Sequence, residues 1–344
     1  MDEPIGLAFA VKADSLYRQT TPRPEPIRRG LFFGSCMGAR STISKSCTIF
    51  LICLAIWLPA IGSADMVTDQ FGRKVNIPEH PQRIVSLAPS ITEIIFSLDL
   101  DERLVGATQF SDYPPRAASL PKVGSYVHLD LERIVALNPD LCIAVKDGNP
   151  IAVVRKLEAL KIPVYAVDPR NLEAVLDTLR ELGGLLGVHD RAEEIVVEMA
   201  GRIRQVRRQS ACTDKRPGVF FQIGVSPIVS VGTPTFIHEL IVMAGGVNLS
   251  RGPIPYPRFS KEQVLGLQPE VMIITSMARE TVFAEVKAQW QQWSEMPAVK
   301  NDRIHLVDSN VFDRASPRLI QGLELLARLI HPNCFPTTVK GEIQ

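Results

Sequence analysis

The sequence of 344 residues lacks an excess of charge of one sign: 38 basic residues stand against 37 acidic residues, and the formal net charge is +1. Proteins that bind DNA or RNA gather positive charge on one face, so this balance argues against a nucleic-acid partner. Long apolar runs are also lacking, since the run over residues 47–58 reaches Pro59 well short of the about 20 apolar residues that a membrane span needs. Neither a nucleic-acid-binding protein nor a multispanning membrane protein is therefore expected.

The run over residues 47–58 is instead typical of a secretory signal peptide. Arg40 and Lys45 precede it, and the small residues 62–64 follow it, so we expect cleavage after Ala64. A membrane anchor is the less favoured alternative, because the run is short.

The residues before Met37 are rich in proline and arginine and fit a signal peptide poorly. We therefore expect translation to start at Met37 rather than Met1. Residues 1–64 are then an N-terminal extension plus signal peptide, and the mature chain is exported to the periplasm.

Cysteine is scarce after Ala64, where only Cys142, Cys212 and Cys334 remain. Three cysteines permit at most one disulfide, which excludes a scaffold held together by disulfides. Cys142 lies in an apolar run and is expected to be a buried small side chain. Whether Cys212 and Cys334 pair stays open.

The motifs of common enzyme classes are absent as well. The sequence has no G-x-S-x-G elbow, no GxxxxGK[ST] phosphate loop and no HExxH. The six histidines are scattered singly, and the glycine doublets 183–184 and 245–246 are expected to end helices. We therefore expect no enzymatic activity, no resident cofactor and no metal site. An exported α/β enzyme with its active site between two lobes is the less favoured alternative.

From Arg83 onward, short apolar strands alternate with amphipathic helices, which predicts parallel sheets covered on both faces. Residues 90–93 are expected to form a capping box that opens a helix over 91–98, and Asp130 is expected to cap a helix over 131–137. Strands are expected at residues 84–87, 104–106, 141–145 and 164–167.

Residues 131–143 recur as residues 261–273 at a constant offset of 130, which argues for two similar lobes. Between the copies, residues 190–208 carry apolar side chains at helical spacing, with acidic residues in the first turn and arginines in the last. The prediction is an α/β fold of two Rossmann-like lobes, each with a central, mostly parallel sheet. The lobes cover residues 65–187 and 212–344, one long rigid helix over 188–211 joins them, and a ligand cleft lies between them.

Three aromatic residues are candidates for the wall of that cleft. Tyr126 and Tyr256 precede the two copies of the repeated helix and therefore occupy equivalent loops, while Phe110 follows a predicted strand end, where ligands bind in open α/β sheets. Together they indicate a pocket for a large planar or apolar ligand.

Two carboxylates also repeat. Glu132 lies in the first turn of one repeated helix, and Glu262 lies in the first turn of the other. Either residue alone is explained by a favourable interaction of its negative charge with the helix dipole. As a pair related by pseudo-two-fold symmetry, they suit arginines on a two-fold-symmetric partner.

The sequence resembles the family of substrate-binding proteins that serve ABC importers of cobalamin, siderophores or haem. Within that family it resembles the cobalamin-binding members most. The resemblance runs from about residue 82 to about residue 330. It is carried by residues 111–115, 131–140, 146–149 and 312–318.

The resemblance implies a class III periplasmic binding protein, non-enzymatic and monomeric. It would hold a corrinoid in the cleft and deliver it to an inner-membrane permease dimer with its ATPase. Glu132 and Glu262 match the permease-docking glutamates of the family. The ligand-binding positions that match are Phe110, Tyr126, Tyr256, Asn310, Val311, Phe312, Asp313 and Arg314.

The sequence departs from the cobalamin binders at several of these positions. Val145 replaces a tryptophan, Asn310 and Val311 replace an Asp-Trp pair, and Tyr126 and Tyr256 replace larger tryptophan rings. These changes do not affect the expected carrier role, but with them the resemblance no longer specifies which ligand is bound. A haem or ferric-siderophore carrier is the alternative, with Arg258 and Arg314 pairing with an anionic chelate.

Overall fold

The computed structural model describes residues 64–146, 148–276 and 280–335. The predicted N-terminal extension, the start at Met37 and the signal peptide lie outside the described residues, apart from Ala64, with which the first strand begins. None of the helices in the described ranges is both long and apolar enough to cross a membrane.

The N-terminal lobe contains a parallel sheet of four strands in the order β4-β3-β5-β6, which confirms the parallel pairing predicted from the alternation. An antiparallel hairpin precedes it. The strands are β1 (Ala64–Thr68), β2 (Lys74–Pro78), β3 (Ile84–Ser86), β4 (Leu104–Ala107), β5 (Leu141–Val145) and β6 (Val164–Val167).

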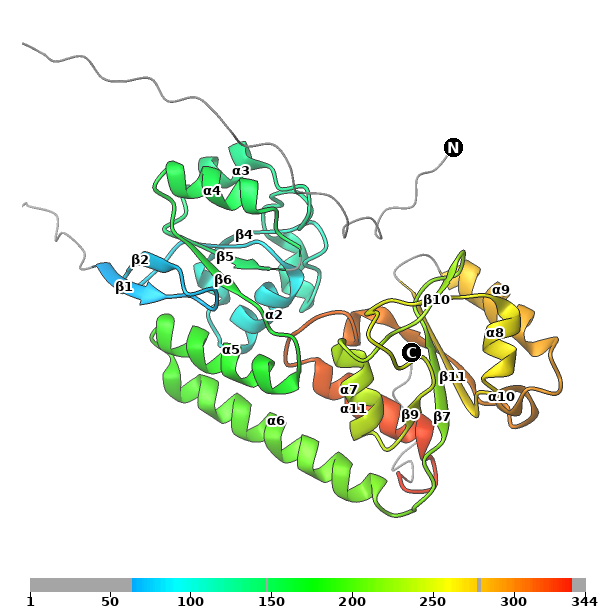
Figure 1. The fold of residues 1–344 in the computed structure, drawn as a ribbon. Helices are drawn as coiled ribbons and strands as arrows, with labels where there is room; N and C mark the ends of the chain where they lie inside the picture. Colours follow the sequence, from blue (N-terminus) through cyan, green and yellow to red (C-terminus); the bar gives the residue numbers. More distant parts are fainter. Residues whose placement is uncertain (1–63, 147, 277–279, 336–344) are drawn as a thin grey trace, which may run out of the picture. The chain divides into compact units, whose positions relative to one another are not determined.

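Helices cover both faces of this sheet (Figure 1), because successive strand residues point to opposite sides. Ile143 of β5 joins the apolar cluster of α2 and α5, whereas its neighbours Cys142 and Ala144 join that of α3 and α4. The helices are α2 (Pro89–Ser97), α3 (Leu131–Ala136), α4 (Ile151–Ala159) and α5 (Leu172–Leu185), with 3-10 turns η1 (Asp101–Arg103) and η2 (Pro115–Ser119).

The C-terminal lobe repeats this plan with a parallel sheet in the order β12-β11-β7-β9. Helices α7 and α11 pack on one face, and α8, α9 and α10 on the other. Its strands are β7 (Gly218–Gln222), β8 (Ile228–Val229), β9 (Val247–Asn248), β10 (Arg258–Phe259), β11 (Val271–Ser276) and β12 (Ile304–Asp308). Its helices are α7 (Phe236–Met243), α8 (Lys261–Gly266), α9 (Glu280–Gln291), α10 (Pro297–Lys300) and α11 (Leu319–Ile330), with the 3-10 turn η3 (Ser309–Val311).

Both copies of the repeated sequence fold in the same way. The side chains of Asp130 and Ser260 cap α3 and α8, each accepting a hydrogen bond from the backbone N–H three residues on. After each helix comes one residue in the left-handed region, Asn138 at φ 47° and Gln268 at φ 46°. A central strand, β5 or β11, then follows. The repeat and the cap at Asp130 are therefore confirmed.

The long helix between the copies is α6 (His189–Ser210), whose 22 residues span about 33 Å at 1.5 Å per residue. It packs against α5 and α11. Its buried apolar side chains belong to one continuous apolar cluster that also includes residues of α2, α5, α7 and α11. Arg202 adds a two-pronged ion pair, donating to both carboxylate oxygens of Glu324 at 2.8 and 3.0 Å.

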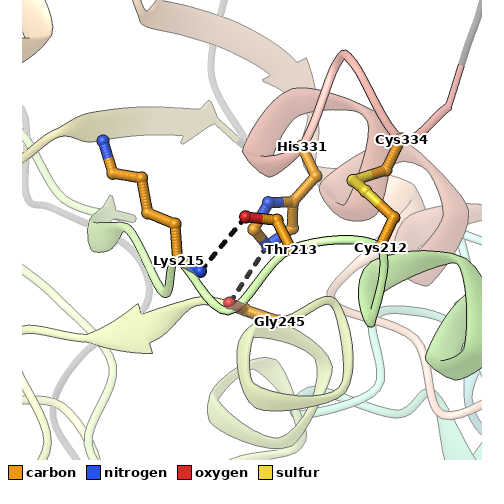
Figure 2. The surroundings of a disulfide bond; sticks show 6 residues. All are labelled: Cys212, Thr213, Lys215, Gly245, His331 and Cys334. Atoms are coloured by element: carbon orange, nitrogen blue, oxygen red, sulfur yellow. Dashed lines mark hydrogen bonds between the residues drawn. A yellow bond between two sulfur atoms is a disulfide. The ribbon is translucent and has the colours of Figure 1, made fainter.

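A disulfide between Cys212 and Cys334 ties the end of α6 to the end of α11, with the Cα atoms 6.0 Å apart (Figure 2). Beside it, the His331 ring donates from Nε2 to the carbonyl oxygen of Gly245 at 3.1 Å, and burial lowers the pKa of this ring. Cys142 is free and buried, as predicted, and burial raises the pKa of its thiol to about 12.

Candidate functional site

Two of the three predicted pocket aromatics lie together in the N-terminal lobe. The rings of Phe110 and Tyr126 meet edge to face, with centroids 6.4 Å apart. Phe110 is 47% exposed, and Tyr126 is partly exposed. A large exposed aromatic pair offers a rigid apolar surface that a flat ligand can cover.

The loop that carries Tyr126 is fixed by its neighbours. Gly124 takes a left-handed φ of 93°, and a Cβ there would lie 2.4 Å from the carbonyl oxygen of His128. The Asn149 amide donates at 2.8 Å both to the Tyr126 carbonyl and to the Leu87 carbonyl. Tyr126 is therefore anchored to the carboxyl-end edge of the sheet, where open α/β folds bind ligands.

The loop that carries Phe110 rests on a buried cluster of hydroxyl groups. The Thr92 hydroxyl donates to Ser111 Oγ at 2.9 Å, and the hydroxyls of Thr108 and Ser111 are also 2.9 Å apart. Since all three hydroxyl residues are buried, this cluster fixes the turn from Thr108 to Ser111 on α2. The Phe110 ring is thereby presented on a rigid support.

Tyr256 lies in the equivalent loop of the C-terminal lobe and is 49% exposed. The carbonyl groups on either side, of Pro255 and Pro257, accept hydrogen bonds from the backbone N–H groups of Gly232 and Ser230 at 2.7 and 3.0 Å. That Tyr256 faces Tyr126 across a ligand cleft stays a prediction.

The predicted ligand segment 310–314 follows β12 and is folded onto its own lobe. Phe312 is fully buried and meets Phe221 edge to face at 5.4 Å, so it holds the segment from within. Val311 is partly buried against the same cluster. Asp313 as a whole residue is exposed, but the protein around its carboxyl group shields that group from water and raises its pKa to about 6, opposed by the Ser309 hydrogen bond and by Arg314.

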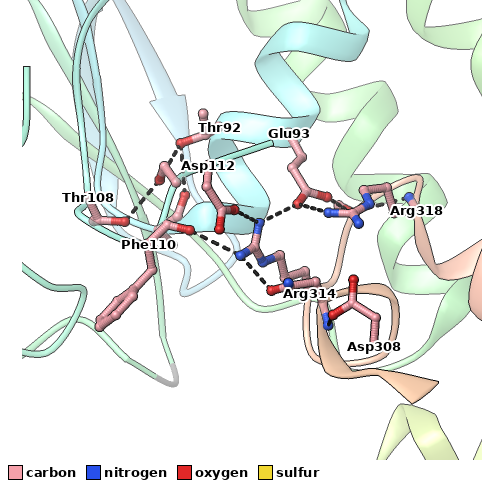
Figure 3. Close-up of polar contacts among 12 residues, drawn as sticks. Thr92, Glu93, Thr108, Phe110, Asp112, Asp308, Arg314 and Arg318 are labelled. Atoms are coloured by element: carbon pink, nitrogen blue, oxygen red, sulfur yellow. Dashed lines mark hydrogen bonds and ion pairs between the residues drawn. The ribbon is translucent and has the colours of Figure 1, made fainter. Parts of the chain in front are cut away.

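Arg314 links this segment to the N-terminal lobe (Figure 3). Its Nη1 donates to Glu93 Oε1 and to Asp112 Oδ1, each at 2.8 Å. Its Nη2 donates to the Phe110 carbonyl at 3.1 Å and to Asn310 Oδ1 at 2.8 Å. The structure therefore brings together three of the predicted ligand residues, Phe110, Asn310 and Arg314, through one guanidinium group.

Glu93 is the central acceptor of this network. Besides Arg314, it accepts hydrogen bonds from Arg318 Nη1 at 3.1 Å and from the Ser316 hydroxyl. Burial lowers the pKa of Arg314, but the hydrogen bonds to Glu93 and Asp112 outweigh that and raise it above its ordinary value. Two guanidinium groups stand against two carboxylates, so the network carries no net charge.

This role of Glu93 was not predicted from the sequence, in which residues 90–93 match a capping box. That assignment is wrong: α2 begins earlier, with Pro89 in its first turn and Ala88 as an N-cap that makes no side-chain hydrogen bond. The Glu93 carboxylate instead points to the C-terminal lobe. A single carboxylate between the buried residues Ile91 and Ile94 is the signal that could have revealed a buried partner.

Glu132 and Glu262 occupy matching places in the two lobes. Each is exposed in the first turn of its helix, directly after the capping residue, and neither takes part in an ion pair among the described residues. The Ser260 side chain and the helix-terminal backbone lower the pKa of Glu262, so this carboxylate is charged at neutral pH. Among the described residues, no cluster of three or more His, Cys, Asp or Glu could hold a metal ion.

Residues 84–311 match the family model described as periplasmic binding protein. The chain is 32% identical over 244 residues to the vitamin B12-binding protein of Vibrio campbellii, covering 70% of this chain and 86% of that relative. The crystal structure of the periplasmic vitamin B12-binding protein BtuF of Vibrio cholerae superimposes with a TM-score of 0.65 at 29% identity, over 75% of this chain and 99% of that one.

A periplasmic haem-binding protein of Pseudomonas aeruginosa is also similar. Its TM-score is 0.69 at 28% identity, over 75% of this chain and 96% of that one. Both structures share with this chain the mixed α/β architecture with a parallel sheet in each of two lobes. Since the family match covers more than half of the chain and a relative at 32% identity extends over 70% of it, the chain belongs to the periplasmic binding protein family of solute carriers.

Proposed function

We propose that this chain is the solute-binding component of an ABC importer and that it binds cobalamin or a related corrinoid. The observation that carries the proposal is the exposed Phe110–Tyr126 pair beside an arginine whose charge is already compensated. A corrin is a large, flat ring with a rim of neutral amides, so it needs apolar contact and hydrogen bonding rather than an excess of charge. The relatives named for vitamin B12 binding support the same ligand class.

In this proposal Phe110, Tyr126 and Tyr256 contact the ring, and segment 310–314 supplies polar contacts to its rim. Haem is the second candidate, supported by the haem-binding relative from Pseudomonas aeruginosa. A tyrosine phenol can ligate haem iron, and Tyr126 is accessible enough to do so. The two ligands differ in charge, since haem carries two propionates.

Calorimetric titration of the mature chain tests the ligand. The ligands are cyanocobalamin, dicyanocobinamide, haem and a hydroxamate siderophore. We expect one-to-one corrinoid binding, micromolar or tighter, and the ratio between the two corrinoids reports whether the lower axial base contributes. Binding of haem or siderophore without corrinoid binding would refute the corrinoid proposal, and binding of none of the four would refute the carrier proposal.

We also propose that the chain is exported to the periplasm and that its signal peptide is cleaved after Ala64. In support, the small residues 62–64 follow the apolar run, and the hairpin also pairs Asp65 with Ile77, a pairing that the mature chain keeps. Intact mass and N-terminal sequencing of protein released from the periplasm test this, with Asp65 expected as the first residue. A mature N-terminus upstream of the apolar run over 47–58 would refute cleavage.

Delivery to the permease is proposed to use Glu132 and Glu262. Their matched positions on α3 and α8 suit a partner with two-fold symmetry, and carboxylates that have no ion-pair partner among the described residues are suited to arginine pockets. We further propose that the carrier is a monomer, because two copies of this chain would otherwise present four such carboxylates. Light scattering of the purified protein tests that state.

The docking proposal predicts that Glu132→Ala with Glu262→Ala abolishes uptake in cells and leaves the dissociation constant of the ligand within about two-fold. The matched control is Glu173→Ala with Asp190→Ala, which removes two exposed first-turn acids of α5 and α6. The control carries the same loss of charge and of helix-dipole complementation. Normal uptake by the first variant, or an equal loss by the control, would contradict docking through these glutamates.

A further inference from the structure

Glu93 is the one charged residue of α2, and its side chain is 2% exposed. All three groups that donate to it, from Arg314, Ser316 and Arg318, belong to the C-terminal lobe. We propose that Glu93 is a positioning residue for the ligand site: it holds the Phe110 loop and segment 310–314 in the arrangement that binds. The proposal rests on the proposed carrier function.

The contacts of Arg314 show how Glu93 acts at a distance from the ligand. Nη1 of the guanidinium is fixed by Glu93 and Asp112, and Nη2 then points at the Phe110 carbonyl and at Asn310. In Figure 3 the Phe110 ring points away from Arg314, so the backbone is held while the ring stays available to a ligand.

Asp112 alone does not replace Glu93. The Asp112 side chain is 58% exposed, so water screens its attraction for Arg314. Glu93 is enclosed and also binds Arg318, whose guanidinium stacks 3.8 Å above the centre of the Tyr113 ring. Removing the Glu93 charge would leave two largely buried guanidinium groups without their common acceptor, an arrangement that is strongly disfavoured.

The expected consequence is a shift of population. Without Glu93 the two loops separate or reorient in the free protein, and the apparent affinity falls in proportion to the fraction of molecules that still hold the binding arrangement. If that fraction drops to between about 10% and about 1%, the affinity falls by about ten- to about a hundred-fold. The aromatic surfaces that touch the ligand are chemically unchanged.

The test compares Glu93→Gln with a matched control, Glu324→Gln. Both substitutions preserve size and remove one carboxylate from an ion pair with arginine. Glu324, however, pairs with Arg202 between α6 and α11, away from the predicted ligand residues. We expect Glu93→Gln to weaken cyanocobalamin binding by about ten- to a hundred-fold, mainly through a slower association rate, and Glu324→Gln to stay within two-fold. Glu93→Asp keeps the charge and should recover part of the affinity.

Hydrogen exchange of the ligand-free protein separates this proposal from the choice of ligand. We expect residues 108–112 and 310–316 to lose protection in Glu93→Gln but not in Glu324→Gln. Unchanged exchange in both segments, or wild-type affinity of Glu93→Gln, would overturn the positioning role. An equal loss of affinity in the control would assign the effect to general destabilisation and overturn it as well. A wild-type protein that binds no corrinoid would refute the proposed ligand alone, since the exchange result stands without it.

Discussion

The disulfide between Cys212 and Cys334 is predicted to stabilise the fold mainly by restricting the unfolded chain. The bridge closes a loop of 122 residues, from the end of α6 to the end of α11. In the chain-entropy account a loop of this length contributes about 5 kcal/mol at 25 °C. In the native state, α6 and α11 are also held by their shared apolar cluster and by the Arg202–Glu324 pair, so the folded state is expected to survive reduction.

The measurement is urea unfolding of the wild type, Cys212→Ala, Cys334→Ala and the double variant. Each single substitution removes the whole bridge, so all three variants should lose about the same 5 kcal/mol. With an m-value of about 3 kcal/mol/M, the midpoint falls by roughly 1.7 M. Losses that add in the double variant would show that side-chain packing is responsible. A loss below about 1 kcal/mol would refute the loop-closure argument.

Two further predictions concern the ligand segment and the Tyr126 loop. Gly148→Ala would place a Cβ 2.8 Å from Cδ2 of the Tyr126 ring, so the ring must shift. We expect weaker ligand binding with little change in the unfolding midpoint. Unchanged affinity in calorimetry would show that the position of the ring is unimportant for binding. Asp313 has a folded-state pKa raised to about 6, so the folded state binds its proton more tightly than the unfolded state and wild-type stability falls as pH rises from about 4 to about 6. Asp313→Asn should lack that fall in urea midpoints measured across this range, and parallel profiles would contradict it.

Local sequence patterns were sufficient to predict the two repeated units and the long helix α6. The residues that decide α3 and α8 lie within a few positions of one another: a capping side chain, an acidic first turn, and a left-handed residue before proline. The long helix was likewise recognisable, because apolar spacing and end charges persist over 22 residues. The two antiparallel pairs, β1–β2 and β8–β10, were not foreseen, since polar residues interrupt β1, β2 and β10, and β8 has only two residues.

The ion network around Glu93 could not be predicted from local sequence patterns, for a different reason. Glu93 and Arg314 are 221 residues apart, and nothing near Glu93 specifies that partner. Residues 90–93 also match the capping-box motif, which by itself accounts for a glutamate at position 93. In the structure the helix begins earlier, at Pro89 with Ala88 as its N-cap, so the motif does not form. A polar residue whose position in a helix demands burial needs a partner, but the sequence does not identify it.

This network also bears on which ligands the site favours. From sequence, Arg314 was a candidate to pair with an anionic chelate. In the structure its four contacts are with Glu93, Asp112, Asn310 and the Phe110 backbone, so an anion would have to displace groups that already satisfy it. The free energy lost when a buried carboxylate is displaced from two guanidinium groups exceeds the free energy gained from a new ion pair with an exposed ligand carboxylate. The charge balance beside the Phe110–Tyr126 pair therefore favours a neutral, amide-rimmed ring over a dianionic one, even though the fold itself serves both kinds of carrier.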